Sequence, residues 1–267
     1  MCIRDRIMIL DEIIEKRKIQ LAAEKSRISL EEQKKLADIA PAPKGFGRAL
    51  RANGLSVISE VKKASPSKGL IQPDFDPVKI AAAYEKAGAA AISCLTEEHY
   101  FQGSSEYLRE IVENVKIPVL RKDFIFDEYQ IYEARALGAD AVLLIAAVLD
   151  DNRLKTLFNL AKSLGLDVLG EAHDENEVRR LVSAGFGIIG VNNRNLKTFE
   201  VSLENTRRLS ALVHENAVFV CESGIKDNAD MRFAKSCGAD AVLIGETLMR
   251  SGLAGIPDCM AALREGV

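Results

Sequence analysis

Short apolar runs alternate with amphipathic segments along most of the chain. The runs are rich in Val, Ile, Leu and Ala, and they predict eight strands, at residues 56–62, 90–96, 118–123, 141–148, 167–172, 188–193, 218–223 and 241–245. Helical periodicity between them predicts helices at residues 76–88, 104–115, 127–137, 150–164, 174–184, 202–213, 226–237 and 256–265. Runs that are apolar on both faces, such as 141–145, are typical of a parallel sheet covered by helices.

A glycine recurs at the end of the amphipathic segments, just before an apolar run. Gly88, Gly138, Gly185 and Gly238 stand roughly fifty residues apart. Glycine is favoured there because a left-handed helix cap costs it no Cβ clash. Each interval has room for two strand–helix units of about 25 residues. Eight such units predict a single (β/α)8 TIM barrel. The alternative is an open doubly wound sheet. The lack of a GxGxxG motif after the first strand argues against it.

The residues before the first strand predict a helical extension and no separate domain. A second helix begins at Ser29, where Glu32 completes a capping box. The Pro-containing segment 41–45 then breaks the helix and leads to a short turn at 46–52. The first helix carries one apolar stripe, formed by Ile9, Leu10, Ile13 and Ile14.

Composition and charge limit the partners of the protein. The 267 residues are 48% hydrophobic and 28% charged, which suits one large globular barrel. Lys and Arg total 36 against 39 Asp and Glu, so no basic excess attracts nucleic acid or anionic lipid. The longest apolar run, 141–149, falls well short of the ~20 residues that cross a bilayer. Five cysteines without a CxxC pair, and a start without a signal-peptide pattern, predict reduced thiols and a cytoplasmic location.

Polar side chains occupy inward-facing positions at the carboxyl ends of five predicted strands. Side chains alternate along a strand, and TIM barrels carry their active sites at these ends. Taken singly, each residue could form an ordinary rim contact. Together, three carboxylates, two lysines and an amide at one mouth predict a catalytic cluster, because buried charges are costly unless they are paired. Its members are Glu60, Lys62, Lys122, Glu171, Asn192 and Glu222, with Arg194 following at the rim.

Two loops at the same end predict a phosphate site. Ser223–Gly224 follows the seventh strand and Gly245–Glu246 the eighth, and each pair is expected to open a helix. Backbone N–H groups at helix starts bind anions, and these loops commonly seat phosphate in barrels. Ser65 in the first loop adds a hydroxyl. The alternative is that the glycines only relieve tight turns.

The aromatic residues and the histidines are weaker indications of a functional site. Phe101 and Phe124 follow the second and third strands, where they either sandwich an aromatic substrate ring or serve as core or lid residues. The three histidines, His99, His173 and His214, lack zinc-site spacing and are interpreted as surface or loop residues. The sequence therefore predicts no metal and no cofactor.

Several motifs together resemble the indole-3-glycerol phosphate synthase family. They are ISEVKKASPS at 58–67, LTEEHYFQG at 95–103, PVLRKDFI at 118–125, GVNNRNL at 190–196, CESGI at 221–225 and LIGETLM at 243–249. The likeness runs from about Ile9 to the end. Only residues 1–7 lie outside the pattern, which suggests either a start nearer Met8 or a sequencing remnant. The expected organisation is then a helical extension at 8–52 and a barrel at 53–267.

The resemblance implies a lyase of tryptophan biosynthesis. It closes the ring of 1-(2-carboxyphenylamino)-1-deoxyribulose 5-phosphate with loss of carbon dioxide and water. By resemblance, Lys122 is the general acid on the ketone and Glu171 its partner acid/base. Lys62 handles the carboxylate and shuttles protons, with Glu60 and Asn192 orienting it and the substrate hydroxyls. The remaining matched residues are Arg194, Glu222 and Ser223 for substrate binding, and Ser65, Gly224, Gly245 and Glu246 for phosphate. A monomer or weak homodimer is expected.

Three rival functions remain open at this stage. A Schiff-base aldolase needs a lysine that has lost its proton, whereas nearby carboxylates keep a lysine protonated. A phosphate-binding isomerase of the same pathway would use a carboxylate or thiol pair, and Cys221 has the wrong parity for that role. A catalytically silent binding subunit is the third, and the intact acids and lysines argue against it.

Overall fold

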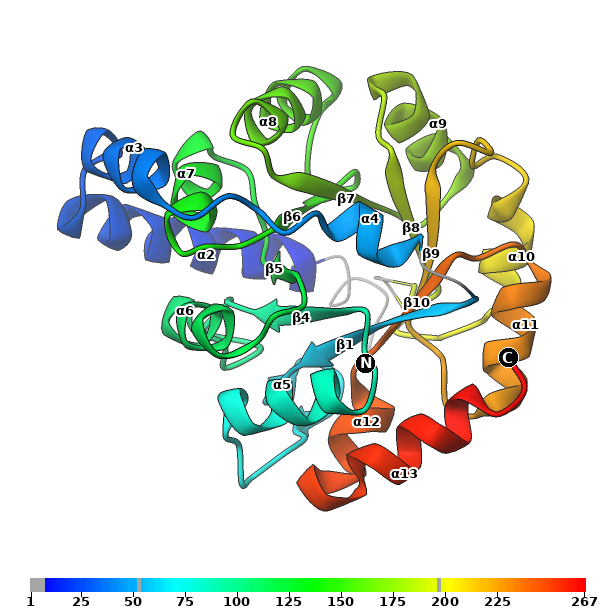
Figure 1. Cartoon of the computed structure of the whole chain (residues 1–267). Coiled ribbons are helices and arrows are strands. Elements are labelled where there is room, and N and C mark those ends of the chain that lie inside the picture. The colour runs from blue at the N-terminus through cyan, green and yellow to red at the C-terminus, as the bar shows by residue number, and fades with distance from the viewer. Residues whose placement is uncertain (1–7, 52–53, 196–197) are drawn as a thin grey trace.

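The computed structural model describes residues 8–51, 54–195 and 198–267, and it contains eight parallel strands closed into a barrel with helices around it (Figure 1). The last strand pairs with the first, with Ser56 opposite Ala241, so the predicted TIM barrel is confirmed and the open sheet is excluded. The barrel strands are β1 (Ser56–Val61), β4 (Ala91–Leu95), β5 (Val119–Lys122), β6 (Ala141–Ile145), β7 (Asp167–Ala172), β8 (Ile188–Asn192), β9 (Val218–Glu222) and β10 (Ala241–Ile244).

Most helices between the strands begin where short polar side chains cap them; α10 lacks such a cap. Asp76, Asp150 and Asp227 each accept a hydrogen bond from a backbone N–H of the following turn. The helices are α5 (Pro77–Lys86), α6 (Ser105–Asn114), α7 (Glu128–Ala136), α8 (Asp151–Ser163), α9 (Glu175–Ala184), α10 (Glu204–Ser210), α11 (Asn228–Ser236), α12 (Glu246–Arg250) and α13 (Gly252–Arg264). The last prediction was placed too late, because α13 begins at Gly252 and runs through Pro257.

Apolar side chains form two layers, as the alternation along the strands predicts. Inward-facing residues such as Leu120, Leu169 and Val220 fill the barrel interior. Their neighbours, Cys221 among them, pack between the strands and the helices. The inward and outward assignments made from the sequence are therefore confirmed for these strands.

Three helices precede the barrel: α2 (Met8–Arg27), α3 (Leu30–Ile39) and α4 (Phe46–Leu50). The capping box of Ser29 and Glu32 is present at the start of α3. Phe46 and Leu50 of α4 belong to the interior cluster, where they close the amino end of the barrel. Residues 1–7 and the proposed boundary between 52 and 53 lie outside the described residues.

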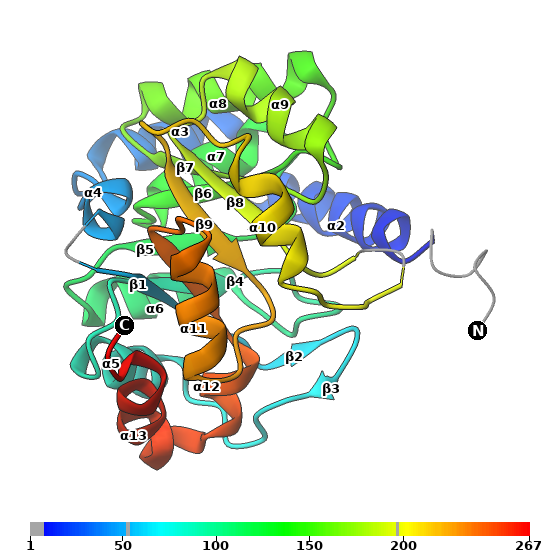
Figure 2. The same cartoon turned by 90° about the vertical axis from the view of Figure 1, so that its right-hand side faces the viewer.

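A small antiparallel hairpin interrupts the loop after β1. It consists of β2 (Ala64–Ser65) and β3 (Gly69–Leu70), and it projects at the end of the barrel away from α4 (Figure 2). The sequence did not predict it, because two-residue strands are too short to show a period. In the part of the chain that the structure describes, no helix is long and apolar enough to span a membrane.

Candidate active site

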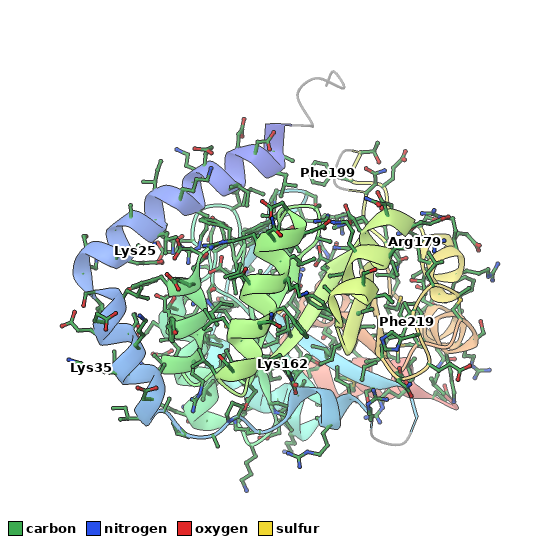
Figure 3. The ribbon with its side chains drawn as sticks, turned by 90° about the horizontal axis from the view of Figure 1, so that it is seen from above. Lys25, Lys35, Lys162, Arg179, Phe199 and Phe219 are labelled. Atoms are coloured by element: carbon green, nitrogen blue, oxygen red, sulfur yellow. The ribbon has the colours of Figure 1, made fainter. Side chains whose placement is uncertain are left out.

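A cavity of about 820 Å³ opens at the carboxyl ends of the barrel strands. Figure 3 shows Phe199, one of its lining residues, at the end of the molecule where α2 begins, opposite α4. Every candidate site residue named from the sequence lines this cavity. They are Glu60, Lys62, Ser65, Phe101, Lys122, Phe124, Glu171, Asn192, Arg194, Glu222, Ser223, Gly224, Gly245 and Glu246.

Lys122, the last residue of β5, lies among carboxylates. Its Nζ is 3.3 Å from Glu171 Oε2 and 3.7 Å from Glu222 Oε2. Burial alone would lower the pKa of Lys122, but Glu171, Glu222 and Glu60 outweigh it and raise the pKa above its usual range. Lys122 is therefore an ammonium group, able to donate a proton or a hydrogen bond.

Glu171, on β7, faces Lys122 across the barrel mouth. Its Oε1 accepts a hydrogen bond of 3.2 Å from Asn192 Nδ2 on β8 and lies 3.3 Å from His173 Nε2. Burial would raise the pKa of Glu171, yet Lys122, His173 and Asn192 hold it well below its usual range. Glu171 is thus a buried carboxylate with a cation on each side.

Glu222, the last residue of β9, has the opposite character. Burial and the nearby Glu171 raise its pKa to about 8, against the lowering effect of Lys122. A side chain at Gly190 would overlap the Glu222 carboxyl, so this glycine makes room for it. At neutral pH Glu222 carries a proton, and the cluster holds a neutral acid beside an ionised one.

Glu60 and Lys62 form a contacting ion pair on β1 and just beyond it. Burial would raise the pKa of Glu60, but Lys62 and Lys122 lower it. A Cβ at Gly245 would overlap the Glu60 carboxylate and lie 2.8 Å from Lys62 Nζ. A side chain at position 245 would displace this ion pair, so the pair requires glycine there.

The two loops of the predicted phosphate site differ from each other. Gly245–Glu246 opens α12, as expected. Ser223–Gly224 does not open a helix, because α11 begins only at Asn228. Both residues instead have left-handed backbone conformations, with φ of 65° and 99°.

The left-handed turn is held from behind by a buried amide. Asn193 Nδ2 donates hydrogen bonds of 3.1 and 3.0 Å to the backbone oxygens of Glu222 and Ser223. The turn at Ser223 and Gly224 is therefore fixed by hydrogen bonds from this side chain and not by the start of a helix.

The sequence analysis missed three basic residues that line the cavity near these loops: Lys68, Lys226 and Arg250. Lys68 Nζ and Arg250 Nε lie 3.6 and 2.9 Å from Glu246 Oε1. Glu246 and Arg250 are four residues apart on one helix, and this spacing could have predicted their ion pair from the sequence.

The other end of the cavity is apolar. The rings of Phe101 and Phe124 lie with centroids 6.2 Å apart and planes at 41°. Ile9, Leu10 and Ile13 of α2 line the same cavity, which the sequence analysis did not foresee. This end offers a surface to an aromatic ring.

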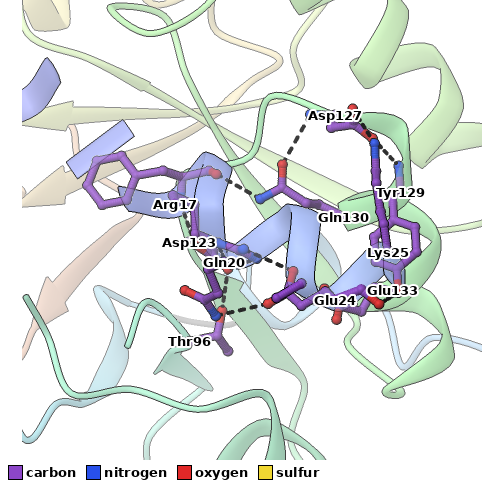
Figure 4. A network of polar contacts seen from close by, with 12 residues as sticks. Arg17, Gln20, Glu24, Lys25, Thr96, Asp123, Asp127, Tyr129, Gln130 and Glu133 are labelled. Atoms are coloured by element: carbon purple, nitrogen blue, oxygen red, sulfur yellow. Dashed lines mark hydrogen bonds and ion pairs between the residues drawn. The ribbon is translucent and has the colours of Figure 1, made fainter. Parts of the chain in front are cut away.

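A buried ionic network fixes the strand end beside Lys122 (Figure 4). Asp123 accepts hydrogen bonds from Arg17 Nε of α2 at 3.0 Å, from Arg121 at 3.1 Å and from Thr96 Oγ1 at 2.7 Å. Burial would raise the pKa of Asp123, but Arg17 and Arg121 lower it. The network therefore ties the N-terminal helix to the strand that carries Lys122.

All three histidines lie in loops, within the predicted surface or loop positions. His99 and His214 are exposed, whereas His173 is largely buried and in contact with Glu171, a contact that the sequence analysis did not foresee. Across residues 8–51, 54–195 and 198–267, no group of three or more His, Cys, Asp or Glu side chains could hold a metal ion.

Comparison with known proteins identifies the family of the chain. Residues 10–255 match the family model described as indole-3-glycerol phosphate synthase. Proteins of that name from Acetivibrio thermocellus and Ruminiclostridium cellulolyticum are 51% and 52% identical to the chain. The aligned regions cover 91% and 93% of the chain and 95% and 96% of the relatives.

Solved structures with low identity support the fold alone. An N-acetylmannosamine-6-phosphate 2-epimerase from Clostridium perfringens superposes with a TM-score of 0.59 at 16% identity, over 73% of this chain and 88% of that one. A mandelate oxidase variant gives 0.62 at 22% identity, over 85% and 76%. The matched family model and the relatives of about half-identical sequence establish that the chain belongs to the indole-3-glycerol phosphate synthase family of lyases.

Proposed function

We propose that the chain converts 1-(2-carboxyphenylamino)-1-deoxyribulose 5-phosphate to indole-3-glycerol phosphate, with loss of carbon dioxide and water. The observation that carries the proposal is the contact of 3.3 Å between Lys122 and Glu171 inside one cavity of a closed barrel. A donor and an acceptor of protons then face the same substrate, as condensation and dehydration both require.

Lys122 acts as the general acid of ring closure. Its raised pKa keeps it protonated, so it can polarise the ketone oxygen and transfer a proton to it when the new carbon–carbon bond forms. Glu171 is the partner acid/base. The ring carbon that closes loses carbon dioxide and not a proton, and Glu171 takes the proton from the chain carbon beside the nitrogen when the hydroxyl leaves as water. A positioned acid or base is typically worth ~10²–10⁴-fold in rate.

Lys62 handles the substrate carboxylate and shuttles protons. Its contact with Glu60 supports the idea that Glu60 orients it. Asn192 holds Glu171 through a hydrogen bond of 3.2 Å and is in reach of the chain hydroxyls.

The remaining residues bind the two ends of the substrate. Phe101 and Phe124 take the aromatic ring, and Arg194, Glu222 and Ser223 take the sugar chain and carboxylate. The phosphate is bound by Ser65, Gly224, Gly245 and the backbone of Glu246. Lining of one cavity by all of these groups supports the proposal.

We also propose a cytoplasmic enzyme that is a monomer or weak homodimer. The four described cysteines are free thiols, which suits a reducing compartment. All candidate site residues line one cavity of a single chain, which supports chemistry that needs no second copy. Sedimentation across a range of protein concentrations would measure the association directly.

Turnover of the anilino-deoxyribulose phosphate tests the function. The chain contains no Trp, so formation of an indole product is visible as new fluorescence against a dark protein. Release of one carbon dioxide per indole is expected, and a protein that binds the substrate but forms no indole contradicts the proposal. Borohydride added during turnover separates the aldolase: a stable substrate adduct on Lys62 or Lys122 would show Schiff-base chemistry.

A further inference from the structure

We propose that His173 is a positioning residue for Glu171. The imidazolium of His173 keeps the Glu171 carboxylate facing Lys122, and it keeps Glu171 ionised between proton transfers. The inference rests on the proposed acid/base role of Glu171. It assigns a part in the reaction to a group outside the cavity lining.

His173 has a carboxylate beside each ring nitrogen, with a hydrogen bond at Nδ1 and a charge contact at Nε2. Its Nε2 lies 3.3 Å from Glu171 Oε1, and its Nδ1 lies 3.1 Å from Glu177 Oε2. The side chain is only 12% exposed. A neutral imidazole has one donor and one acceptor nitrogen, whereas an imidazolium donates from both. Two carboxylates facing the two nitrogens therefore favour the cation.

The second carboxylate is itself fixed by the start of α9. Glu177 accepts a hydrogen bond of 2.7 Å from the backbone N–H of His173, and its own N–H donates to the capping Asp174 at 2.9 Å. The ring is thus anchored on the helix side, away from the cavity. Any movement of Glu171 toward solvent would have to break its contact with an immobile partner.

A shared amide aligns the two partners of Glu171 Oε1. Asn205 Nδ2 of α10 donates hydrogen bonds of 3.1 Å to the backbone oxygens of both His173 and Asn192. The two groups that contact Glu171 Oε1 are consequently held by one side chain behind them. This is the arrangement expected of support for a catalytic carboxylate.

Charge explains what the cation adds. The titratable groups facing His173 are Glu171 from β7 and Glu177 from α9, with Lys122 and Glu222 on the far side of Glu171. Burial would lower the pKa of His173, but the two carboxylates raise it to about 10. When Lys122 gives its proton to the substrate it loses its charge, and His173 remains as the cation beside Glu171. Glu171 then stays a carboxylate that can accept the next proton.

The kinetic test replaces the cation by a neutral residue of similar length. We expect His173→Gln to lower kcat by about 10-fold or more with little change in KM, because a binding group is not lost. The pKa of Glu171 should rise when the neighbouring cation is removed, but it starts well below its usual range, so the readout is the loss of kcat at unchanged KM. Glu177→Gln should lower kcat by less. The exposed His214→Gln is the matched control and should leave kcat unchanged.

A spectroscopic test does not depend on turnover. The chain has only three histidines, so the ¹⁵N signal missing from His173→Gln identifies His173. We expect that signal to remain an imidazolium up to at least pH 9, and its pKa to fall in Glu171→Gln. A neutral ring at pH 7, or an unchanged kcat in a folded His173→Gln, would overturn the inference. If His173→Gln does not fold, the wild-type signal and Glu177→Gln decide the matter. A wild-type protein without turnover would overturn the proposed function but not the NMR result.

Discussion

Lys122 is a buried ammonium that lies beside the Glu171 carboxylate and the Glu222 carboxyl group and that lines the cavity. If it transfers a proton in the transition state, its loss should reduce the rate far more than substrate affinity. We expect Lys122→Ala to lower kcat by ~10²–10⁴-fold while the substrate dissociation constant changes by only a few-fold. Steady-state kinetics and equilibrium titration would measure the two quantities separately. Lys155→Ala, at an exposed position of α8, is the control. Equal losses in rate and affinity would make Lys122 a binding group.

Glu222 gives the molecule a pH dependence of known sign. Its pKa in the folded protein is about 8, against an ordinary value of 4.5. Between these values the folded state holds a proton that the unfolded state has released, so Glu222 stabilises the fold at low pH and this contribution is lost as the pH rises through 8. Replacing Glu222 by Gln removes the titration.

Denaturant unfolding at pH 5 and pH 9 would test this directly. The free energy of unfolding of Glu222→Gln, minus that of the wild type, should be greater at pH 9 by roughly 1–3 kcal/mol. The exposed Glu215→Gln should give no such trend. A difference that stays constant with pH would show that the proton on Glu222 does not distinguish the two states.

Helix α2 is attached to the barrel by a buried charged side chain whose removal should destabilise the fold. Arg17 is fully buried and bonds both Asp123 and Glu24, at 3.0 and 2.9 Å. Removing one partner of a buried pair leaves the other charge uncompensated, which costs about 3–5 kcal/mol. Arg17→Ala should therefore lower the free energy of unfolding by that amount. Lys18→Ala, which breaks only an exposed pair with Glu15, should cost less than about 1 kcal/mol. A similar small loss for both variants would contradict the importance of the buried network.

Much of the barrel and of the cavity lining could be predicted, because a parallel strand repeats every two residues and its carboxyl end lies at a fixed place in the fold. Lys122, Glu171 and Glu222 were therefore assigned to one mouth from parity alone, and they meet there. Whether a residue faces inward or outward does not depend on where its strand ends, so errors in the predicted strand bounds did not change these assignments.

Other parts of the site follow no period. Ile9 and Leu10 line the cavity because α2 packs across the barrel mouth, which depends on the tertiary contact of Arg17 with Asp123. His173 faces Glu171 from the loop after β7, where Asn205 of α10 bonds its backbone oxygen. The left-handed turn at Ser223 is held by Asn193, which follows β8. Each of these depends on contacts between segments distant in sequence, which periodicity does not encode.

At the scale of the whole molecule, the cluster depends on closure of the barrel. Its six charged and amide groups come from β1, β5, β7, β8 and β9 or the residues directly following them. The pairing of β1 with β10 completes the ring and brings Glu60 and Lys62 beside Gly245. A partly folded chain would leave these charges apart, so the site and the barrel should form together.

A ligand that contacts several loops should accordingly stabilise the barrel as a unit. At a concentration 100 times its Kd, a ligand that binds only the folded state adds ~2.7 kcal/mol to the free energy of unfolding. We expect indole-3-glycerol phosphate to have this effect on a single thermal transition. The phosphate-free indole glycerol at the same concentration should have much less, since it lacks the phosphate that the loops of Ser65, Gly224 and Gly245 would bind. Differential scanning calorimetry would measure both. Equal stabilisation by the two compounds would show that the phosphate is not bound by the loops of Ser65, Gly224 and Gly245, and a second transition that does not shift would show that part of the barrel unfolds independently of the site.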